Sequence, residues 1–345
     1  MTKKVVVGMS GGVDSSVAAY LLKERGYEVI GVSLQTFNEK GKDIEDAERV
    51  AGTLGIPFYI INVCEMFEKE IINGFVSEYM NGRTPNPCCV CNARIKWKVL
   101  LKWALENGAE YIATGHYARI DRLPNGRYAV CNSITAKKDQ TYALCNLSQE
   151  QLAHTIMPVG ELEKKDVRRI AERIGIDVAG KPDSQDICFV PDNDYPAFIK
   201  TKMGIQCARG NFVDTDGNIL GEHKGIFCYT IGQRKGLNLA MGKPVFVNKI
   251  RPETNEVVVG GEDIIFCTML EAGNINLMGA ASIHTGDRFM GKIRYAHAGE
   301  MCTVTYFDGD TIKLRFDKPV RAATPGQSVV LYSGPYVMAG AVISG

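Results

Sequence analysis

A loop of glycine and hydroxyl residues near the N-terminus constrains the fold of this chain more than any other segment. It reads Gly8-Met9-Ser10-Gly11-Gly12-Val13-Asp14-Ser15-Ser16 and follows the short apolar run of residues 5–7. A β-branched run bounded by glycine is typical of a buried strand. The helical spacing of apolar side chains in residues 13–25, closed by Gly26, predicts a helix directly after the loop. The chain therefore begins with a strand, a tight turn and a helix.

The same alternation of strand and helix continues beyond this loop, which is called the glycine loop (residues 8–16) below. Strands are expected at residues 28–34, 58–63 and 111–114, and helices at residues 43–55 and 95–106. Strands that alternate with helices pair in parallel, because each helix carries the chain back to the starting edge of the sheet. The expected fold class is therefore α/β, with a doubly wound parallel sheet.

A helical middle region is expected before the chain changes character. Ser148 and Gln151 have the spacing of a capping box, in which each side chain accepts from the backbone N–H of the other. Residues 162–174 have the apolar spacing of a helix, and Gly175 is placed to end it. The basic residues on the outer face of this helix are interpreted as a solvated surface: Lys164, Lys165, Arg168, Arg169 and Arg173.

Short strands dominate from about residue 211 onward. Residues 302–316 alternate apolar and polar side chains on either side of Asp308-Gly309, which is typical of a β-hairpin. Several short strands in succession indicate a small closed β-domain. The length of 345 residues allows two or three domains. We expect an α/β domain at residues 1–200, a small central domain at residues 201–269 and a C-terminal β-barrel-like domain at residues 270–345.

The overall composition excludes some classes of protein. Lys+Arg is 40 and Asp+Glu is 39, so the net charge is +1, which excludes coating of nucleic acid by bulk charge but not a local basic groove. The 11 cysteines are odd in number and spread over the chain, which argues against a disulfide scaffold and for a reducing compartment. No apolar run approaches the ~18 residues of a membrane span. We expect a cytoplasmic protein without membrane contact.

The glycine loop has the properties of an anion site. Gly11 and Gly12 let the backbone turn tightly and point its N–H groups into one concavity, and the following helix N-terminus adds its positive dipole end. The hydroxyls of the loop, on Ser10, Ser15 and Ser16, add donors. Asp14 is unexpected beside phosphates unless a cation lies between them, which implies Mg²⁺. The loop is not a Walker A motif, because no Gly-Lys pair is followed by Ser or Thr.

Two cysteines stand out as candidate nucleophiles. Cys91 precedes the predicted helix of residues 95–106, where free N–H groups and the helix dipole are expected to lower its pKa. Cys188 follows polar residues that suggest an accessible loop. Cys88 and Cys91 also form a C-x-x-C, but there is no second pair of ligands for zinc. Cys88, Cys91 and Cys188 could together hold an iron–sulfur cluster, and their spacing does not decide between a cluster and a redox pair.

The glycine loop resembles the signature of the N-type ATP pyrophosphatases, the PP-loop superfamily, which cleave ATP between the α- and β-phosphates. The whole chain resembles the tRNA-specific 2-thiouridylases of the MnmA/TrmU type. The resemblance rests on the following segments in family order: Arg83-Thr84-Pro85-Asn86-Pro87, Thr114-Gly115-His116-Tyr117, Lys138-Asp139-Gln140, Gly160-Glu161-Leu162, Asp186-Ile187-Cys188-Phe189, Thr230-Ile231-Gly232-Gln233-Arg234-Lys235-Gly236-Leu237 and Thr324-Pro325-Gly326-Gln327.

This resemblance implies roles for individual residues. ATP would be bound by Gly8, Met9, Ser10, Gly11, Gly12, Val13, Asp14, Ser15, Leu34 and Gly115. Cys188 would carry a persulfide, and Cys91 would be the second catalytic cysteine, which attacks that persulfide or forms a disulfide after transfer. Residues expected at the target base or the tRNA are Asn86, Pro87, Cys88, His116, Lys138, Asp139, Gln140, Arg294, Tyr295 and Gln327. The loop of residues 138–140 is hard to explain by packing alone.

The implied reaction is ATP-dependent 2-thiolation of the wobble uridine in tRNA, with ATP and Mg²⁺ as cofactors. A sulfur-relay protein or cysteine desulfurase would supply sulfur, and the chain would act as a monomer. Many family members have Asp where this chain has Cys88, which makes thiolation through a [4Fe-4S] cluster at Cys88, Cys91 and Cys188 a serious alternative. An alternative of a different class is a small-molecule ATP-pyrophosphatase amide ligase, which would need neither thiol.

Overall fold

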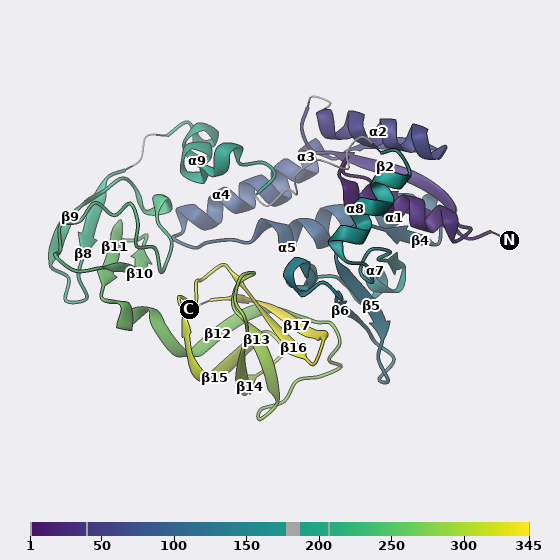
Figure 1. Ribbon diagram of the computed structural model, residues 1–345. Helices are drawn as coiled ribbons and strands as arrows, with labels where there is room; N and C mark the ends of the chain where they lie inside the picture. The colour runs from purple at the N-terminus through teal and green to yellow at the C-terminus, as the bar shows by residue number, and fades with distance from the viewer. Residues whose placement is uncertain (1, 39–40, 177–186, 206–207, 345) are drawn as a thin grey trace.

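The computed structural model describes all residues except 1, 39–40, 177–186, 206–207 and 345. A parallel sheet in the order β3-β2-β1-β4-β7 forms the centre of the N-terminal domain (Figure 1). Its strands are β1 (Lys4–Gly8), β2 (Glu28–Gln35), β3 (Phe58–Asn62), β4 (Tyr111–Ala113) and β7 (Thr155–Ile156). The pairings β1–β2, β2–β3, β1–β4 and β4–β7 are all parallel. The predicted doubly wound α/β fold is therefore confirmed.

Helices cover both faces of this sheet because side chains of β1 alternate between two cores. Val5 and Val7 belong to a core that also contains side chains of α1 (Val13–Glu24), α2 (Lys42–Leu54) and α8 (Lys164–Arg173). Val6 belongs to a second core with Trp97 and with side chains of α6 (Lys98–Glu106). The sheet thus separates a face with α1, α2 and α8 from a face with α6.

The glycine loop lies at the point where the strand order reverses. β1 has β2 on one side and β4 on the other, so the chain winds outward in opposite directions from its carboxyl end. In open α/β sheets the crevice at this switch point is where ligands bind. The position of the loop in the topology thus agrees with the anion site expected from its residues.

Two long helical segments lie on the α6 face, and each contains a π-helical turn. The first consists of α3 (Cys64–Phe67), the π-turn Glu68–Ile72 and α4 (Asn73–Met80). The second consists of α5 (Pro87–Cys91), the π-turn Asn92–Trp97 and α6, and is called the thiol helix (residues 87–106) below. Sequence analysis placed the start of the second helix too late and missed the first.

The remaining helices of the N-terminal domain are α7 (Gln149–Ala153) and α9 (Tyr195–Met203). The capping box predicted for Ser148 and Gln151 is present at the start of α7: the Ser148 hydroxyl accepts from the Gln151 N–H at 3.2 Å, and the Gln151 side chain accepts from the Ser148 N–H at 3.0 Å. Within the described part of the chain, no helix is long and apolar enough to cross a membrane.

Two β-structures follow. A four-stranded sheet in the order β10-β11-β8-β9 contains β8 (Gly210–Val213), β9 (Ile219–His223), β10 (Phe246–Arg251) and β11 (Glu256–Gly260). A closed antiparallel barrel contains β12 (Phe266–Leu277), β13 (Arg288–Lys292), β14 (Glu300–Phe307), β15 (Thr311–Arg321), β16 (Ser328–Ser333) and β17 (Tyr336–Ile343). Pairing of β12 with both β15 and β17 closes this barrel. The predicted hairpin at residues 302–316 is confirmed as β14 and β15.

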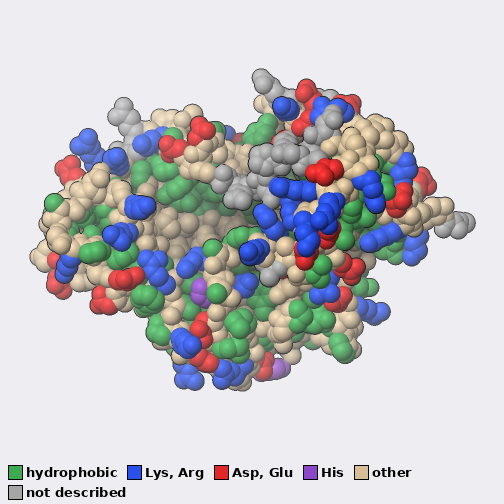
Figure 2. Space-filling view, viewed as in Figure 1, with side chains coloured by type: hydrophobic (Ala, Val, Ile, Leu, Met, Phe, Trp, Pro, Cys, Tyr) green, Lys and Arg blue, Asp and Glu red, His purple; other side chains and the backbone are tan. Residues whose placement is uncertain are grey.

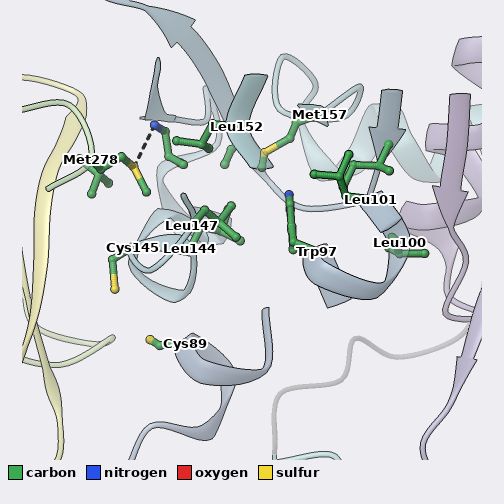
Figure 3. Close-up of a cluster of buried hydrophobic side chains, with 14 of the residues drawn as sticks. Cys89, Trp97, Leu100, Leu101, Leu144, Cys145, Leu147, Leu152, Met157 and Met278 are labelled. Atoms are coloured by element: carbon green, nitrogen blue, oxygen red, sulfur yellow. Dashed lines mark hydrogen bonds between the residues drawn. The ribbon is translucent and has the colours of Figure 1, made fainter. Parts of the chain in front are cut away.

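A hairpin from the N-terminal domain extends the barrel sheet. β5 (Ala118–Arg122) and β6 (Tyr128–Asn132) pair with each other, and Cys131 of β6 pairs with Tyr336 of β17. The Val130 N–H donates to the Met278 sulfur at 3.4 Å, drawn as a dashed line in Figure 3. One buried core therefore joins the thiol helix, this hairpin and the barrel. No strand was expected at residues 118–132, because neither run shows a clear alternation of apolar and polar side chains.

We predict that Gly340→Ala destabilises the protein through this shared core. A Cβ on Gly340 in β17 would lie 2.8 Å from Cys145 Cβ and 3.0 Å from the Cys145 carbonyl oxygen. Overpacking of this kind costs about 1–3 kcal/mol, so the urea midpoint is expected to fall. Gly52→Ala is the matched control, because a Cβ there meets nothing within 4 Å in the exposed face of α2. An unchanged midpoint for Gly340→Ala would show that the barrel contact is loose.

Candidate functional site

The glycine loop is held in a compact turn at the start of α1. The Ser10 N–H donates to the Ser15 hydroxyl at 3.2 Å, and that hydroxyl lies 3.2 Å from the Gly12 carbonyl oxygen. Gly11 has φ +67°, and a Cβ there would lie 2.1 Å from the Asp43 carbonyl oxygen, so only glycine fits. Among the described residues no side chain caps α1 at Gly12. Its first N–H groups are thus available to an anion.

Two of the hydroxyls expected as donors, on Ser15 and Ser16, donate to the Gly12 carbonyl oxygen inside the loop. Ser16 is fully buried and donates to the Gly12 carbonyl oxygen at 2.8 Å. The expectation that Ser16 adds a donor for a bound anion is therefore wrong. The two other loop hydroxyls, on Ser10 and Ser15, lie 3.3 Å from each other. Of the three, Ser10 is exposed, and Ser15 could donate to an anion only by giving up its contact with Gly12.

The segment after β4 packs directly on the glycine loop. A Cβ on Gly115 would lie 2.4 Å from the Ser15 nitrogen and 2.5 Å from the Asp14 carbonyl carbon, so residue 115 must be glycine for this contact to form. Leu34, near the end of β2, is partly buried and packs against the core of the thiol helix. The structure thus brings the loop, Leu34 and Gly115 to the same edge of the sheet, as expected for one nucleotide site.

The carboxylate of the loop is paired with a lysine that sequence analysis assigned to solvent. Lys164 Nζ lies 2.8 Å from both Asp14 oxygens, and the Tyr117 hydroxyl donates to Asp14 Oδ1 at 2.8 Å. The Lys164 side chain is only 14% exposed, whereas Lys165 next to it is 63% exposed. The interpretation of the basic face of α8 as solvated surface is therefore wrong for Lys164.

The thiol helix carries Cys88 and Cys91 in different environments. Asn86 is the N-cap of α5, with its side-chain oxygen 3.4 Å from the Cys89 nitrogen, and Pro87 occupies the first turn. Cys88 is exposed, whereas Cys91 is 8% exposed and lies in an apolar core. Burial raises the pKa of the Cys91 thiol to about 11. The expected lowering is wrong because Cys91 lies a full turn beyond the N-cap and is surrounded by apolar side chains.

Cys188 lies next to the thiol helix. The residues on either side of it, Ile187 and Phe189, pack into the same core as Cys91, while Cys188 itself is exposed. The charges of Cys188 and Cys88 both raise the pKa of Cys91, and the charge of Cys88 raises the pKa of Cys188. The three thiols expected to share a site are thus electrostatic neighbours. Asp186 of the same sequence motif lies outside the described residues.

Lys96 is a site residue that sequence analysis missed. Its charge lowers the pKa of Cys88, Cys91 and Cys188, in opposition to the desolvation of each sulfur by nearby protein atoms. In a regular α-helix, residues 91 and 96 would be about 140° apart around the axis. The π-turn Asn92–Trp97 has i→i+5 geometry, which brings positions five apart toward the same side. The periodicity of the sequence contains no signal for such a turn.

The described residues do not support a metal cluster. No group of three or more His, Cys, Asp or Glu side chains among them comes together closely enough to hold a metal ion. Cys88 and Cys188 are exposed whereas Cys91 is enclosed by the core of the thiol helix. The thiols are therefore neighbours without forming a ligand set. The arrangement of donors favours the redox pair over the iron–sulfur cluster.

The loop of residues 138–140 has a structural explanation for two of its three side chains. Asp139 accepts from the Ser133 N–H at 3.0 Å, from the Thr141 N–H at 3.1 Å and from the Thr141 hydroxyl at 2.5 Å. Gln140 accepts from the Tyr117 N–H at 2.8 Å. The statement that packing hardly explains this loop is wrong for Asp139 and Gln140, since their side chains fold the loop itself.

The barrel holds the segment that leads into the thiol helix. Gln327 donates to the carbonyl oxygens of Thr84 and Pro85 at 2.9 and 3.3 Å, and the Thr84 N–H donates to the Pro325 carbonyl oxygen at 2.8 Å. Gly326 is so close that a Cβ would meet the Thr84 backbone at 3.0 Å. This turn of the barrel therefore positions Asn86, the N-cap of α5.

Two further residues expected at the tRNA also contact other segments. The Tyr295 hydroxyl donates to the Asp139 carbonyl oxygen at 3.1 Å, although its side chain is exposed. Arg294 donates to the Arg321 carbonyl oxygen at 2.7 Å. Both residues come from the segment between β13 and β14. The structure thus brings Tyr295 of the barrel together with Asp139 of the N-terminal domain, on a surface that a large ligand can reach.

His116 lies between the glycine loop and the thiol helix. Its Nδ1 is 2.9 Å from the Thr114 hydroxyl, and its ring lies 5.3 Å from the Trp97 ring, measured between centroids. Burial, together with the charge of Lys96, lowers the pKa of His116 to about 3. The imidazole is therefore neutral at physiological pH and can act as a hydrogen-bonding group but not as a cation.

A basic surface borders this region. Figure 2 shows Lys and Arg side chains gathered where Figure 1 places α8. Lys165 and Arg169 on α8 are 63% and 73% exposed, although each has an acidic partner, Glu163 or Asp166. The near-zero net charge of the whole chain therefore hides a local positive surface of the kind that attracts a polyanion.

Comparison with known proteins finds matches along almost the whole chain. A model described as tRNA methyl transferase HUP domain matches residues 3–192, one described as tRNA methyl transferase PRC-barrel domain matches residues 197–261, and one described as aminomethyltransferase beta-barrel domain matches residues 267–343. A tRNA-specific 2-thiouridylase MnmA from Lachnoclostridium phytofermentans is 54% identical over 354 residues, with 99% of each chain covered. The protein of that name from Clostridioides difficile is 48% identical, covering 99% of this chain and 98% of its own.

Solved structures give more distant likenesses. A 4-thiouridine synthetase in complex with RNA and ATP has a TM-score of 0.37 and 16% identity, covering 59% of this chain and 50% of that chain. An NH3-dependent NAD synthetase from Campylobacter jejuni has a TM-score of 0.34 and 17% identity, covering 52% and 69%. These TM-scores and identities are too low to support a functional conclusion. The family membership rests on the full-length relatives.

We predict that Lys96→Met raises the pKa of the thiols around it. Removing the ammonium removes the charge that stabilises each thiolate, so alkylation of Cys188 by iodoacetamide is expected to shift to higher pH. Mass spectrometry of the alkylated peptides across pH 7–10 measures this shift, and Lys96→Arg is expected to restore the original profile. Lys98→Met is the matched control, because Lys98 is also exposed on the thiol helix but is not among the charges that act on these thiols. Equal profiles for Lys96→Met and Lys98→Met would exclude this role.

We also predict that His116 makes the fold sensitive to acid. A histidine with a lowered pKa binds its proton less readily in the folded state than in the unfolded state, so stability is complete above about pH 6.5 and is lost as the pH falls toward about 3. His116→Asn removes this group, so its urea midpoint should fall less between pH 7 and pH 5 than that of the unmodified protein. The exposed His284, replaced in the same way, serves as the control.

Proposed function

The chain belongs to the tRNA-specific 2-thiouridylase family and is a tRNA sulfurtransferase; we propose that it thiolates the wobble uridine through base adenylation and a persulfide on Cys188. The matching family models bear the name of a methyltransferase, but the full-length relatives are thiouridylases. The observation that carries the proposal is the approach of two thiols to a nucleotide loop. Leu34 links the two, since it ends a strand beside the loop and packs against the core that contains Cys91.

ATP would bind across the switch point of the sheet. Its phosphates would receive N–H groups from the glycine loop at the start of α1, and the adenine would lie against Leu34 and Gly115. This arrangement uses the helix dipole and the backbone donors of residues 8–15. Mg²⁺ accompanying ATP would neutralise part of the phosphate charge, and Asp14 is the loop carboxylate suited to hold it.

The first chemical step would be attack of the uridine O2 on the α-phosphorus. A bond forms between O2 and phosphorus, the bond to the β-phosphate oxygen breaks, and pyrophosphate leaves. The adenylated base then carries AMP as a leaving group at C2. The base must leave its stack to reach the site, and Asn86, Pro87 and Cys88 at the start of the thiol helix are placed to face it. Cys88 is exposed there, so its side chain replaces the Asp common in this family as a group at the base.

The second step would transfer sulfur. The terminal sulfur of a Cys188 persulfide attacks C2, the bond from C2 to the AMP oxygen breaks, and AMP leaves with the electron pair. Cys91 then attacks the Cys188 Sγ. The bond between this Sγ and the sulfur attached to C2 breaks, and its electron pair remains on the sulfur at C2. The products are 2-thiouridine and a Cys91–Cys188 disulfide, which an external thiol reduces. In the alternative order, Cys91 attacks the persulfide first and releases sulfide.

The chain's own residues prepare the thiols for these roles. Cys188 is exposed and can receive sulfur from a sulfur-relay protein or a cysteine desulfurase. Cys91 is enclosed, and burial raises its pKa to about 11, so it would rest as a thiol beside Cys188. This difference in exposure supports the proposal that Cys188 carries the persulfide and that Cys91 performs the resolving step.

The tRNA would contact the surface between the N-terminal domain and the barrel. His116, Lys138, Asp139, Gln140, Arg294, Tyr295 and Gln327 are the proposed contact residues. The side chains of Asp139, Gln140 and Gln327 already hold backbone groups, so they would act chiefly by shaping this surface. The domain ranges 1–200, 201–269 and 270–345, a cytoplasmic location and a monomeric state complete the proposal.

Two other functions are less well supported. An iron–sulfur route would use Cys88, Cys91 and Cys188, which do not form a ligand set among the described residues. A small-molecule amide ligase would need neither thiol, and the full-length relatives act on tRNA by name. Pyrophosphate release that depends on tRNA, and not on an amino acid or a carboxylic acid, would separate thiolation from ligation.

We predict that Cys188→Ala abolishes tRNA thiolation in a reaction with ATP and a persulfide donor. Cys188 carries the transferred sulfur in the proposed mechanism, and the other exposed thiol at the site, Cys88, is proposed to face the base instead, so 2-thiouridine should fall below detection on a mercury-containing gel that retards thiolated tRNA. Cys267→Ser is the matched control, because Cys267 is a partly buried thiol in the barrel strand β12. Full activity of Cys188→Ala would overturn the assignment. Full activity of iron-free protein would exclude the cluster route.

A further inference from the structure

The hydrogen bond between Thr114 and His116 connects the end of β4 to the candidate site. Thr114 Oγ1 lies 2.9 Å from His116 Nδ1. Thr114 directly follows β4 and is 5% exposed, whereas His116 is only partly buried. Neither side chain makes a second hydrogen bond to a described residue. This one contact therefore decides which ring nitrogen of His116 carries the proton.

The burial of Thr114 decides the direction of this hydrogen bond. A hydroxyl has one proton to donate, and a buried donor without an acceptor is costly. If Nδ1–H donated to Oγ1, the hydroxyl proton of Thr114 would have no acceptor in the described part of the chain. If the hydroxyl donates to Nδ1, its proton is used, and the neutral ring carries its own proton on Nε2. The geometry therefore favours the Nε2–H form of His116.

The ring of His116 is also held in place and kept uncharged. Its centroid lies 5.3 Å from that of Trp97, which is fully buried and donates from Nε1 to the Thr155 hydroxyl at 2.8 Å. Desolvation by the surrounding protein atoms, together with the charge of Lys96, lowers the pKa of His116 to about 3. The Nε2–H group is therefore a neutral donor on a ring whose orientation is fixed.

A neutral donor suits an uncharged carbonyl oxygen, whereas a phosphate is bound more strongly by a cation. Uracil has an acceptor at O4, and cytosine has an amino group at the same place. A hydrogen bond to O2 would draw electron density from the atom that attacks the α-phosphorus. O4 is thus the carbonyl of the base that a donor can hold without weakening this attack.

We propose that Thr114 is a positioning residue that keeps the proton of His116 on Nε2, and that this N–H donates to O4 of the target uracil. His116 touches the base, and Thr114 acts only through His116. Cytosine is rejected because its amino group meets the same donor. This inference rests on the proposed thiolation of the wobble uridine and deepens it, since it assigns recognition of one atom of the base.

The first test measures the tautomer of His116 in the full chain, without ATP or tRNA. The chain has 5 histidines, and nitrogen NMR of protein with ¹⁵N-labelled histidine distinguishes protonated from unprotonated ring nitrogens. His116→Asn identifies the signals of His116. A proton on Nε2 is expected in the unmodified protein and in Thr114→Ser, and a mixture of both tautomers is expected in Thr114→Val, which lacks the hydroxyl. A proton on Nδ1 in the unmodified protein, or an unchanged tautomer in Thr114→Val, overturns the proposal.

The second test compares tRNA that carries uridine at the wobble position with tRNA that carries 4-thiouridine there. Sulfur at position 4 is a weaker acceptor than oxygen, while N3–H and C2 stay in place. Nucleoside mass spectrometry gives the single-turnover rate of 2-thiolation for each tRNA. The ratio of the uridine rate to the 4-thiouridine rate is expected to fall about fivefold in Thr114→Val and to stay unchanged in Thr114→Ser. The ratio between proteins cancels the intrinsic difference in reactivity of the two bases.

Thr305→Val is the matched control, because it also removes one hydroxyl from a partly buried threonine, here in the barrel strand β14, where Thr305 donates to the Lys313 carbonyl oxygen at 3.1 Å. A rate ratio that Thr114→Val leaves unchanged would overturn the contact with O4 while thiolation itself stands. If the unmodified protein thiolates neither tRNA, the proposed function fails and the contact with O4 fails with it. The NMR result would still decide whether Thr114 sets the tautomer.

Discussion

The close contact between Gly115 and the backbone of the glycine loop is the constraint on which the site depends. A side chain at residue 115 would collide with the Ser15 nitrogen and the Asp14 carbonyl carbon. Because β1 and β4 are parallel neighbours, their carboxyl ends must meet, and this contact makes them meet without a gap. The next two residues, His116 and Tyr117, make contacts on opposite faces of the sheet. His116 packs on Trp97 of the thiol helix, and Tyr117 bonds to Asp14 beside Lys164.

The two faces of the sheet consequently differ in their electrostatic environment. On the face of α8, a lysine and two helix ends gather positive charge around the glycine loop. On the face of the thiol helix, desolvation by nearby protein atoms raises the pKa of each thiol and the charge of Lys96 opposes that effect. An adenylation step needs the first arrangement and a sulfur transfer needs the second. In the proposed function, ATP would lie across the edge of the sheet, where residues of both faces can reach it.

The barrel contributes to this site by holding its backbone. Gln327 and Pro325 bind the segment of residues 84–85, and the core of the barrel continues through Met278 into the thiol helix and the hairpin of β5 and β6. The start of the thiol helix, where the target base is expected, is thus fixed by residues more than two hundred positions away in the chain. Through these contacts, the barrel holds the start of the thiol helix in place, whether or not it also binds RNA.

Local patterns were sufficient for the elements whose cause is local. The strand before the glycine loop, the capping box of Ser148 and Gln151 and the hairpin of β14 and β15 were all predicted correctly, because period, caps and turn residues act over a few positions. The anion site at the loop and the choice of Cys91 and Cys188 as nucleophiles stay predictions. Only the tertiary structure decided that Cys91 is enclosed, that a π-turn directs Lys96 to the thiols and that Lys164 reaches Asp14. Burial and pairing of charges arise between distant segments, so no pattern within one segment contains them.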